Sequence, residues 1–188
     1  MRRTAPWLVL LASCAHAPVE SAAPAWKLLG ATPDISEIQF QTTENLNRAT
    51  VTPSGAQGPF VDLKRSPGKI QGTVRLDWPV ELERKGNAIV GRFARDSYDL
   101  TLTADGSEIR ATGLVRGQPT TFWMSPQRVR GMVGSCRFDL VWRAGRYSGA
   151  RTCGPLGQDD VALLVPAALA SWSDPEAAAL LTLVVSRF

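Results

Sequence analysis

A repeat of about twenty residues between Lys69 and Gly154 constrains the fold of this chain more than any other feature of its sequence. In each of five units an apolar residue is followed two places later by a small residue, which is alanine in the third unit and glycine in the others. The apolar residues that begin the units stand 18 to 20 places apart, at Ile70, Ile89, Ile109, Val129 and Tyr147. Polarity alternates with a period of two inside each unit, and a turn signal such as Asp105-Gly106 falls near its middle. Each unit therefore predicts one β-hairpin, and not the leucine-rich or solenoid unit that the period alone would allow.

The alternation gives the predicted sheet one apolar and one polar face, as antiparallel sheets allow. In the last hairpin the apolar face carries Phe138, Leu140, Trp142 and Tyr147. The polar face carries Arg137, Asp139, Arg143, Arg146, Ser148 and Thr152. The sequence predicts a mainly β fold, an antiparallel meander of about nine or more strands that curls into a small barrel or sandwich, because a flat open sheet leaves its edges unpaired.

The repeated glycines lie in phase with the apolar face. We interpret them as sites where the strands coil sharply or where a large neighbour packs closely. The alternative is that they clear room for a ligand inside the sheet. Five aromatic residues of the apolar face are then the candidate ligand-facing side chains: Trp78, Phe93, Tyr98, Trp142 and Tyr147.

The register of the last hairpin predicts a disulfide. A two-residue turn at Ala144-Gly145 places Trp142 opposite Tyr147 and, further along the same ladder, Cys136 opposite Cys153. Their Cα atoms would lie about 4.5 Å apart at a pair without backbone hydrogen bonds, which is at the short end of the disulfide range. No metal or cofactor is expected, since two thiolates without a histidine make an incomplete metal site.

The same rule, applied to a turn at Lys85-Gly86, places Val80 opposite Gly91 and Trp78 opposite Phe93. Large residues would then face small or aromatic ones across the hairpin, which suits a tightly curved barrel.

The C-terminal part, from about residue 159 to residue 188, is predicted to be a helical segment packed on the sheet. Ser173 and Glu176 have the spacing of a capping box, and Pro175 fits the first turn. The apolar residues from 177 to 185 are too many for one exposed stripe, so we expect this helix to be buried against the sheet or across a barrel opening. Asp159-Asp160 is expected to cap a helix and not to act as a catalytic carboxylate pair.

The N-terminal segment has the features of an export signal. Arg2 and Arg3 precede an apolar run, Trp7–Leu11, that is too short to span a bilayer as a permanent helix. The run ends in Leu11-Ala12-Ser13-Cys14, which resembles the lipobox of bacterial lipoproteins. The resemblance implies that Cys14 is lipidated and becomes the first residue of the mature chain. The alternative is an ordinary secretory signal cleaved after Ala15 or Ala17.

The predicted organisation is a signal peptide over residues 1–13, a flexible tether over 14–25 and a single β-rich domain over 26–188. Acyl chains on Cys14 would bind membrane lipid. Ala15 in the position after the lipidated cysteine implies, by resemblance to enterobacterial sorting, the outer membrane, with the domain facing the periplasm or the cell surface.

The composition excludes several chemistries. The one histidine, His16, lies on the tether, so no Ser-His-Asp set is available, and phosphate-loop and dinucleotide motifs are absent. The net charge of +4 falls to +2 when Arg2 and Arg3 are removed from the 21 basic residues that oppose 17 acidic ones, which argues against a nucleic-acid partner. Arginine and aromatic residues interleave at Arg137-Phe138 and Trp142-Arg143, and we attribute this to strand alternation and not to a site for anionic polymers or glycans.

The sequence thus favours a non-catalytic envelope lipoprotein that binds a partner protein or supports an assembly. A carrier of small apolar ligands, built as an up-and-down barrel, is the second hypothesis. A hydrolase of unknown mechanism is the third.

Overall fold

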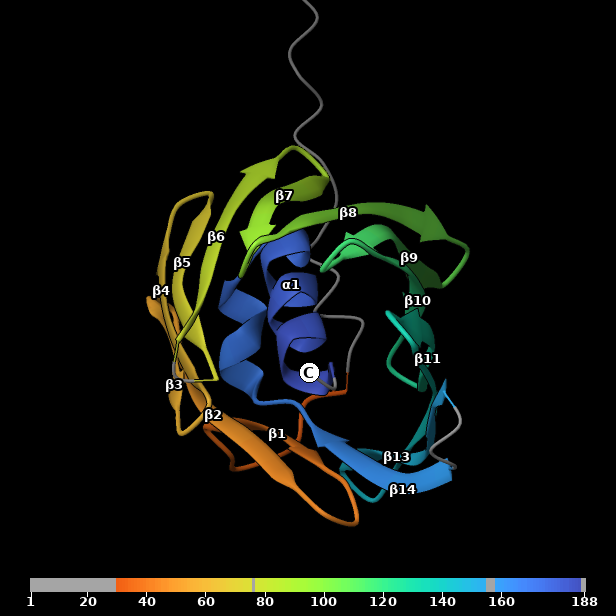
Figure 1. The fold of residues 1–188 in the computed structure, drawn as a ribbon. Coiled ribbons are helices and arrows are strands. Elements are labelled where there is room, and N and C mark those ends of the chain that lie inside the picture. The colour runs from red at the N-terminus through yellow and green to blue at the C-terminus, as the bar shows by residue number, and fades with distance from the viewer. Residues whose placement is uncertain (1–29, 76, 155–157, 187–188) are drawn as a thin grey trace, which may run out of the picture.

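The computed structural model describes residues 30–75, 77–154 and 158–186. Over these residues fourteen antiparallel strands form a closed up-and-down barrel, in which each strand pairs with its neighbours in the sequence and β14 pairs with β1. Figure 1 looks into the barrel and shows helix α1 inside it. The mainly β fold is confirmed, and the barrel is the form that it takes.

The first seven strands are β1 (Glu37–Gln41), β2 (Leu46–Thr52), β3 (Gly55–Gly58), β4 (Val61–Ser66), β5 (Lys69–Val74), β6 (Trp78–Lys85) and β7 (Ala88–Phe93). The next seven are β8 (Asp96–Asp105), β9 (Glu108–Val115), β10 (Gln118–Met124), β11 (Arg128–Val133), β12 (Cys136–Arg143), β13 (Arg146–Cys153) and β14 (Gln158–Leu164). A short 3-10 helix, η3 (Ala167–Ser171), leads into α1 (Asp174–Val185). The nine strands predicted between Lys69 and Gly154 are β5 to β13. Cys14 and the tether lie outside the described residues.

The glycine repeat marks places where neighbouring strands approach too closely for a side chain. A Cβ atom built at Gly72, Gly91, Gly113, Gly131 or Gly149 would lie 2.0 to 2.3 Å from a carbonyl oxygen of the adjacent strand. Real Cβ atoms do not come so close to an oxygen, so glycine is required where the sheet coils. The close approach of the neighbouring backbones therefore accounts for these glycines.

The register of the β12–β13 hairpin is as predicted. Cys136 pairs with Cys153 and Trp142 with Tyr147, and Ala144 and Gly145 have φ angles of 50° and 80°. Two positive φ values in a two-residue turn match the right-handed twist of the strands. The disulfide between Cys136 and Cys153 is formed, with their Cα atoms 4.1 Å apart.

The register predicted for β6 and β7 is wrong by two residues. Lys85 pairs with Ala88, so the turn consists of Gly86 and Asn87, and Leu82 faces Gly91. The physical reason is that Gly86 takes a positive φ of 62° at the first turn position, a conformation that glycine adopts far more easily than lysine does.

The helical segment predicted to begin near residue 159 is also corrected. Residues 158–164 form β14, the strand that closes the barrel between β13 and β1. Asp159 and Asp160 are strand residues and cap no helix, and the Asp159 carboxylate accepts a hydrogen bond from Arg151 at 2.5 Å. Helical structure begins later, at η3.

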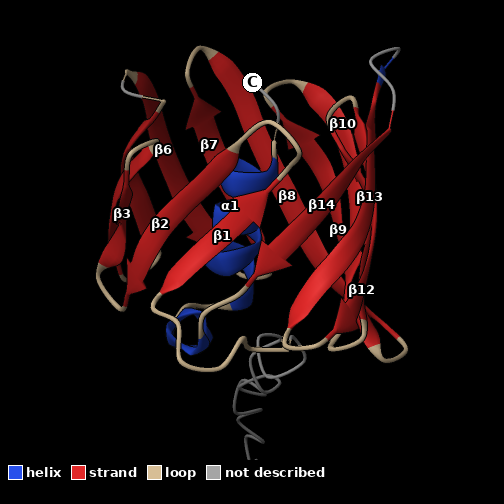
Figure 2. Ribbon diagram, turned by 90° about the horizontal axis from the view of Figure 1, so that it is seen from below, coloured by secondary structure: helices blue, strands red, loops and turns tan. Residues whose placement is uncertain are grey.

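Helix α1 begins as predicted but lies inside the barrel, where it forms the centre of the core. Ser173 and Glu176 form the capping box, Pro175 lies in the first turn, and the helix is buried from Pro175 to Val185. Figure 2 shows the helix within the wall of strands. The mouth of the barrel next to η3 is called the lower end here, and the mouth where α1 finishes is the upper end.

The disulfide gives a direct stability prediction. The double variant Cys136→Ser, Cys153→Ser is expected to unfold with a free energy about 3 kcal/mol lower, because the bridge restricts the unfolded chain. Urea denaturation with and without a reductant measures the difference. Reductant should shift the midpoint of the wild-type chain and leave that of the double variant unchanged; equal midpoints for the two oxidised proteins would contradict the prediction.

Candidate functional site

The interior of the barrel is filled by α1. Two spaces lined partly by α1 have volumes of about 10 and 20 Å³, each enough for roughly one water molecule. Tyr98 on β8 and Thr182 on α1 bring their hydroxyl oxygens to 2.6 Å, which fixes the helix to the wall, and burial raises the pKa of Tyr98. Ligand pockets are usually some hundreds of Å³, so the larger hollows of this molecule, which lie on its outer wall, are the candidates for a site.

The five aromatic residues predicted to face a ligand lie in three separate places. Trp78 and Phe93 contact edge to face at the upper end, with ring centroids 6.0 Å apart. Tyr98 packs against α1. Trp142 and Tyr147 contact edge to face at the lower end, with ring centroids 4.8 Å apart. The structure does not bring these residues together into one site.

The lower-end pair holds the start of the described chain. The Gly30 N–H donates to the Tyr147 hydroxyl at 2.8 Å, and that hydroxyl donates to the Ser125 carbonyl at 2.8 Å. A Cβ atom at Gly30 would lie 2.7 Å from the Trp142 ring, so the backbone lies directly on the indole. Burial raises the pKa of Tyr147 to about 12, so this hydroxyl stays protonated at neutral pH. The described chain therefore begins at the lower tip of the β12–β13 hairpin.

The outer wall next to that tip is rich in arginine. The outward positions of β11, β12 and β13 carry five arginines and one carboxylate, Asp139. We call these five residues the arginine face: Arg128, Arg130, Arg137, Arg143 and Arg146. On the far side of the barrel, the outward lysines of β4 to β6 are balanced by acidic neighbours, which are Asp62, Glu81 and Glu83.

Two of the five arginines form ion pairs. Arg128 donates two hydrogen bonds to Asp139, at 2.7 and 2.6 Å, and the hydrogen bond from Arg128 holds the pKa of that carboxyl below its usual value. Arg130 pairs with Glu108 at 2.7 Å. Within the described ranges, no ion pair involves Arg137, Arg143 or Arg146, so their charge is available to a partner.

Two of the free arginines face each other. Arg143 and Arg146 are directly opposite in the β12–β13 ladder, and both are exposed. Like charges directly opposite on one face of a sheet are destabilising. The Arg143–Arg146 pair thus lowers the stability of the hairpin. An unfavourable pair of this kind is expected where the charges bind a partner.

A hollow of about 420 Å³ lies in the arginine face where β11 coils at Gly131. Its rim includes Trp123, whose ring lies 4.8 Å from the Arg130 guanidinium and 5.4 Å from that of Arg110. Met132 beside it is 39% exposed. Arginine, tryptophan and methionine are the residue types enriched at interfaces. A second hollow of about 440 Å³, over β13, β14 and β1, is lined mainly by polar residues.

The comparisons with known proteins give no assignment: no protein-family model, no curated protein and no solved structure matches this chain. Within the described part of the chain, no three His, Cys, Asp or Glu side chains are grouped so that they could hold a metal ion. Among the described helices, none has the length and apolar character needed to cross a bilayer.

Strand alternation alone is the predicted cause of the arginine–aromatic interleaving. That explains Phe138 and Trp142, which point inward. It does not explain why five outward positions on β11, β12 and β13 are arginine.

Proposed function

We propose that the chain is a non-catalytic lipoprotein of the bacterial envelope, anchored in the membrane through Cys14, and that its barrel has a binding or structural role on the outer surface. The anchor rests on the lipobox resemblance at Leu11–Cys14, and the outer membrane is its proposed location. The observation that carries the outer-surface role is the position of α1 in the interior, where a carrier would hold its ligand.

The up-and-down carrier hypothesis agrees with the strand topology and is not supported by the interior volume. A small apolar ligand would have to displace α1, which is buried from Pro175 to Val185. Nothing in the described residues favours the hydrolase hypothesis over a binding role. Envelope components that meet the outer wall are therefore the proposed partners.

The anchor is tested by the variant Cys14→Ser. After membranes are washed with high salt, the wild-type protein should stay in the membrane fraction and incorporate labelled palmitate, while the variant should do neither, because the thiol that carries the acyl chains is gone. The double variant Cys136→Ser, Cys153→Ser is the matched control, since it removes the other two cysteines and should stay anchored. Salt-resistant retention of Cys14→Ser would contradict the proposal.

A further inference from the structure

We infer that the arginine face is a second membrane contact, which docks the barrel sideways onto the anionic surface of the membrane that holds the anchor. This inference rests on the proposed anchoring at Cys14 for its physiological setting. Its physical basis is the charge of the face, the unpaired state of three of its arginines and the point at which the chain enters the barrel.

The arginine face carries an excess of positive charge. The outward positions of β11 to β13 hold five arginines against one carboxylate, and three of these arginines have no ion pair within the described ranges. Exposed basic side chains near an anionic membrane each contribute about 1 kcal/mol of attraction. Arginine is well suited to this contact because its planar guanidinium binds phosphate with two parallel hydrogen bonds.

The described chain begins next to two arginines of this face. Gly30 lies on Trp142 and donates to the Tyr147 hydroxyl, and these two residues flank Arg143 and Arg146 at the lower tip of the β12–β13 hairpin. The chain therefore joins the barrel beside the two arginines that face each other. Residues 15–29 separate Gly30 from Cys14, and a chain of that length reaches at most about 55 Å. The anchor thus limits the distance between this corner of the barrel and the lipid surface.

Contact with lipid phosphates would be energetically favourable for this face. A polybasic patch is a common second membrane signal beside acyl chains. The repulsion between Arg143 and Arg146 costs stability in the free protein, and lipid phosphates would relieve it. A soluble acidic protein could also be drawn to the charge, but the entry of the tether beside these arginines favours the membrane.

The test separates the face from the anchor by using the full chain with Cys14→Ser. Binding is measured by co-sedimentation with vesicles of phosphatidylcholine, alone or with roughly one quarter phosphatidylglycerol, at low salt. The unanchored chain should bind the anionic vesicles and release them as salt rises.

In the same background, the triple variant Arg137→Gln, Arg143→Gln, Arg146→Gln should lower the partition coefficient on anionic vesicles about 100-fold, at about fivefold for each arginine. The matched control is Lys64→Gln, Lys69→Gln, Lys85→Gln, which removes the same charge from exposed positions of β4 to β6 and should lower binding less than about fivefold. Both variants keep residues 1–29, so any contribution of that segment is equal. A cooperative thermal transition in each protein shows that all of them are folded.

Equal binding to the two kinds of vesicle, or equal losses in the two triple variants, would overturn the inference. So would binding to soluble inorganic polyphosphate as tight as that to anionic vesicles and lost in the arginine variant, which would assign the face to a soluble polyanion. In each of these cases the anchor is judged separately, by the fractionation of Cys14→Ser.

Discussion

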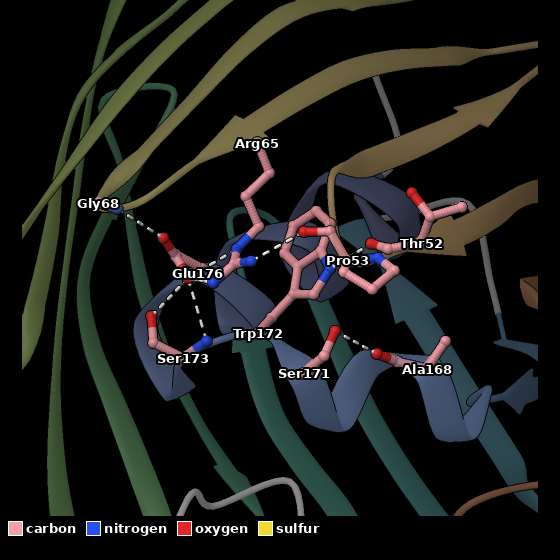
Figure 3. A network of polar contacts seen from close by, with 9 residues as sticks. All are labelled: Thr52, Pro53, Arg65, Gly68, Ala168, Ser171, Trp172, Ser173 and Glu176. Carbon is pink, nitrogen blue, oxygen red and sulfur yellow. Dashed lines mark hydrogen bonds and ion pairs between the residues drawn. The ribbon is translucent and has the colours of Figure 1, made fainter.

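Replacement of Glu176 by alanine is expected to lower the free energy of unfolding by about 3 to 5 kcal/mol, because it leaves Arg65 partly buried without its partner. The Glu176 side chain is 1% exposed and that of Arg65 is 18% exposed, with their charged atoms 2.9 Å apart. The carboxylate also accepts hydrogen bonds from the Gly68 N–H and from the backbone and hydroxyl of Ser173. Figure 3 shows these contacts converging on one side chain at the lower end.

The matched control is Glu108→Ala, which removes the partner of Arg130 on the outer wall. That pair is 20% and 41% exposed, and exposed pairs contribute up to about 1 kcal/mol. Urea denaturation of the two variants measures the contrast. If both variants lose the same small amount, Glu176 does not hold the helix in the barrel.

The same residue makes stability depend on pH. Burial acts to raise the pKa of Glu176, but the hydrogen bonds from Ser173 and Arg65 outweigh it and hold the pKa below its ordinary value. A carboxyl whose pKa is lower in the folded state stabilises the fold above its unfolded pKa, and that stabilisation is lost as the pH falls through the folded pKa. The wild-type chain should therefore lose more stability on acidification than the variant Glu176→Gln does.

Replacement of Gly91 by alanine is expected to cost about 3 kcal/mol or more. Its φ of 154° is unfavourable for other residues, and a Cβ would lie 2.0 Å from the Glu81 carbonyl oxygen. The backbone of β6 or β7 would have to move to admit the methyl group, and the interior is too well packed to allow this easily.

Gly86→Ala is the control for Gly91→Ala. Gly86 also has a positive φ, 62°, but its Cβ would meet nothing within 4 Å, so only the conformational cost of about 1 kcal/mol applies. Thermal unfolding of the two variants measures the difference. Equal losses would mean that conformation alone, and not the close approach of the strands, requires glycine in the repeat.

The parts of the fold that sequence analysis predicted correctly are those set by local chemistry. The capping box at Ser173 follows from two side chains three residues apart, and the pairing of Cys136 with Cys153 follows from the turn at Ala144-Gly145. The turn next to Lys85 is ambiguous in the sequence because two adjacent dipeptides there contain the same glycine, and the one that forms the turn has glycine in its first position.

The parts that were not predicted depend on closure of the sheet. Residues 158–164 have no strong strand signal of their own. They form β14 because β1 and β13 each have an edge with which this segment can pair. The all-round apolar character of residues 177 to 185 predicted burial, but only a closed wall places the helix along its centre.

The order of the chain has a consequence for when this protein can fold. Among the described elements, α1 leaves the ribosome after every strand of the wall, and the wall has no apolar helix to close around until α1 arrives. A nascent chain that stops before Gln158 lacks both β14 and α1, so its sheet keeps two open edges. For a polypeptide proposed to cross a membrane, this order postpones closure of the barrel until α1 has followed the strands.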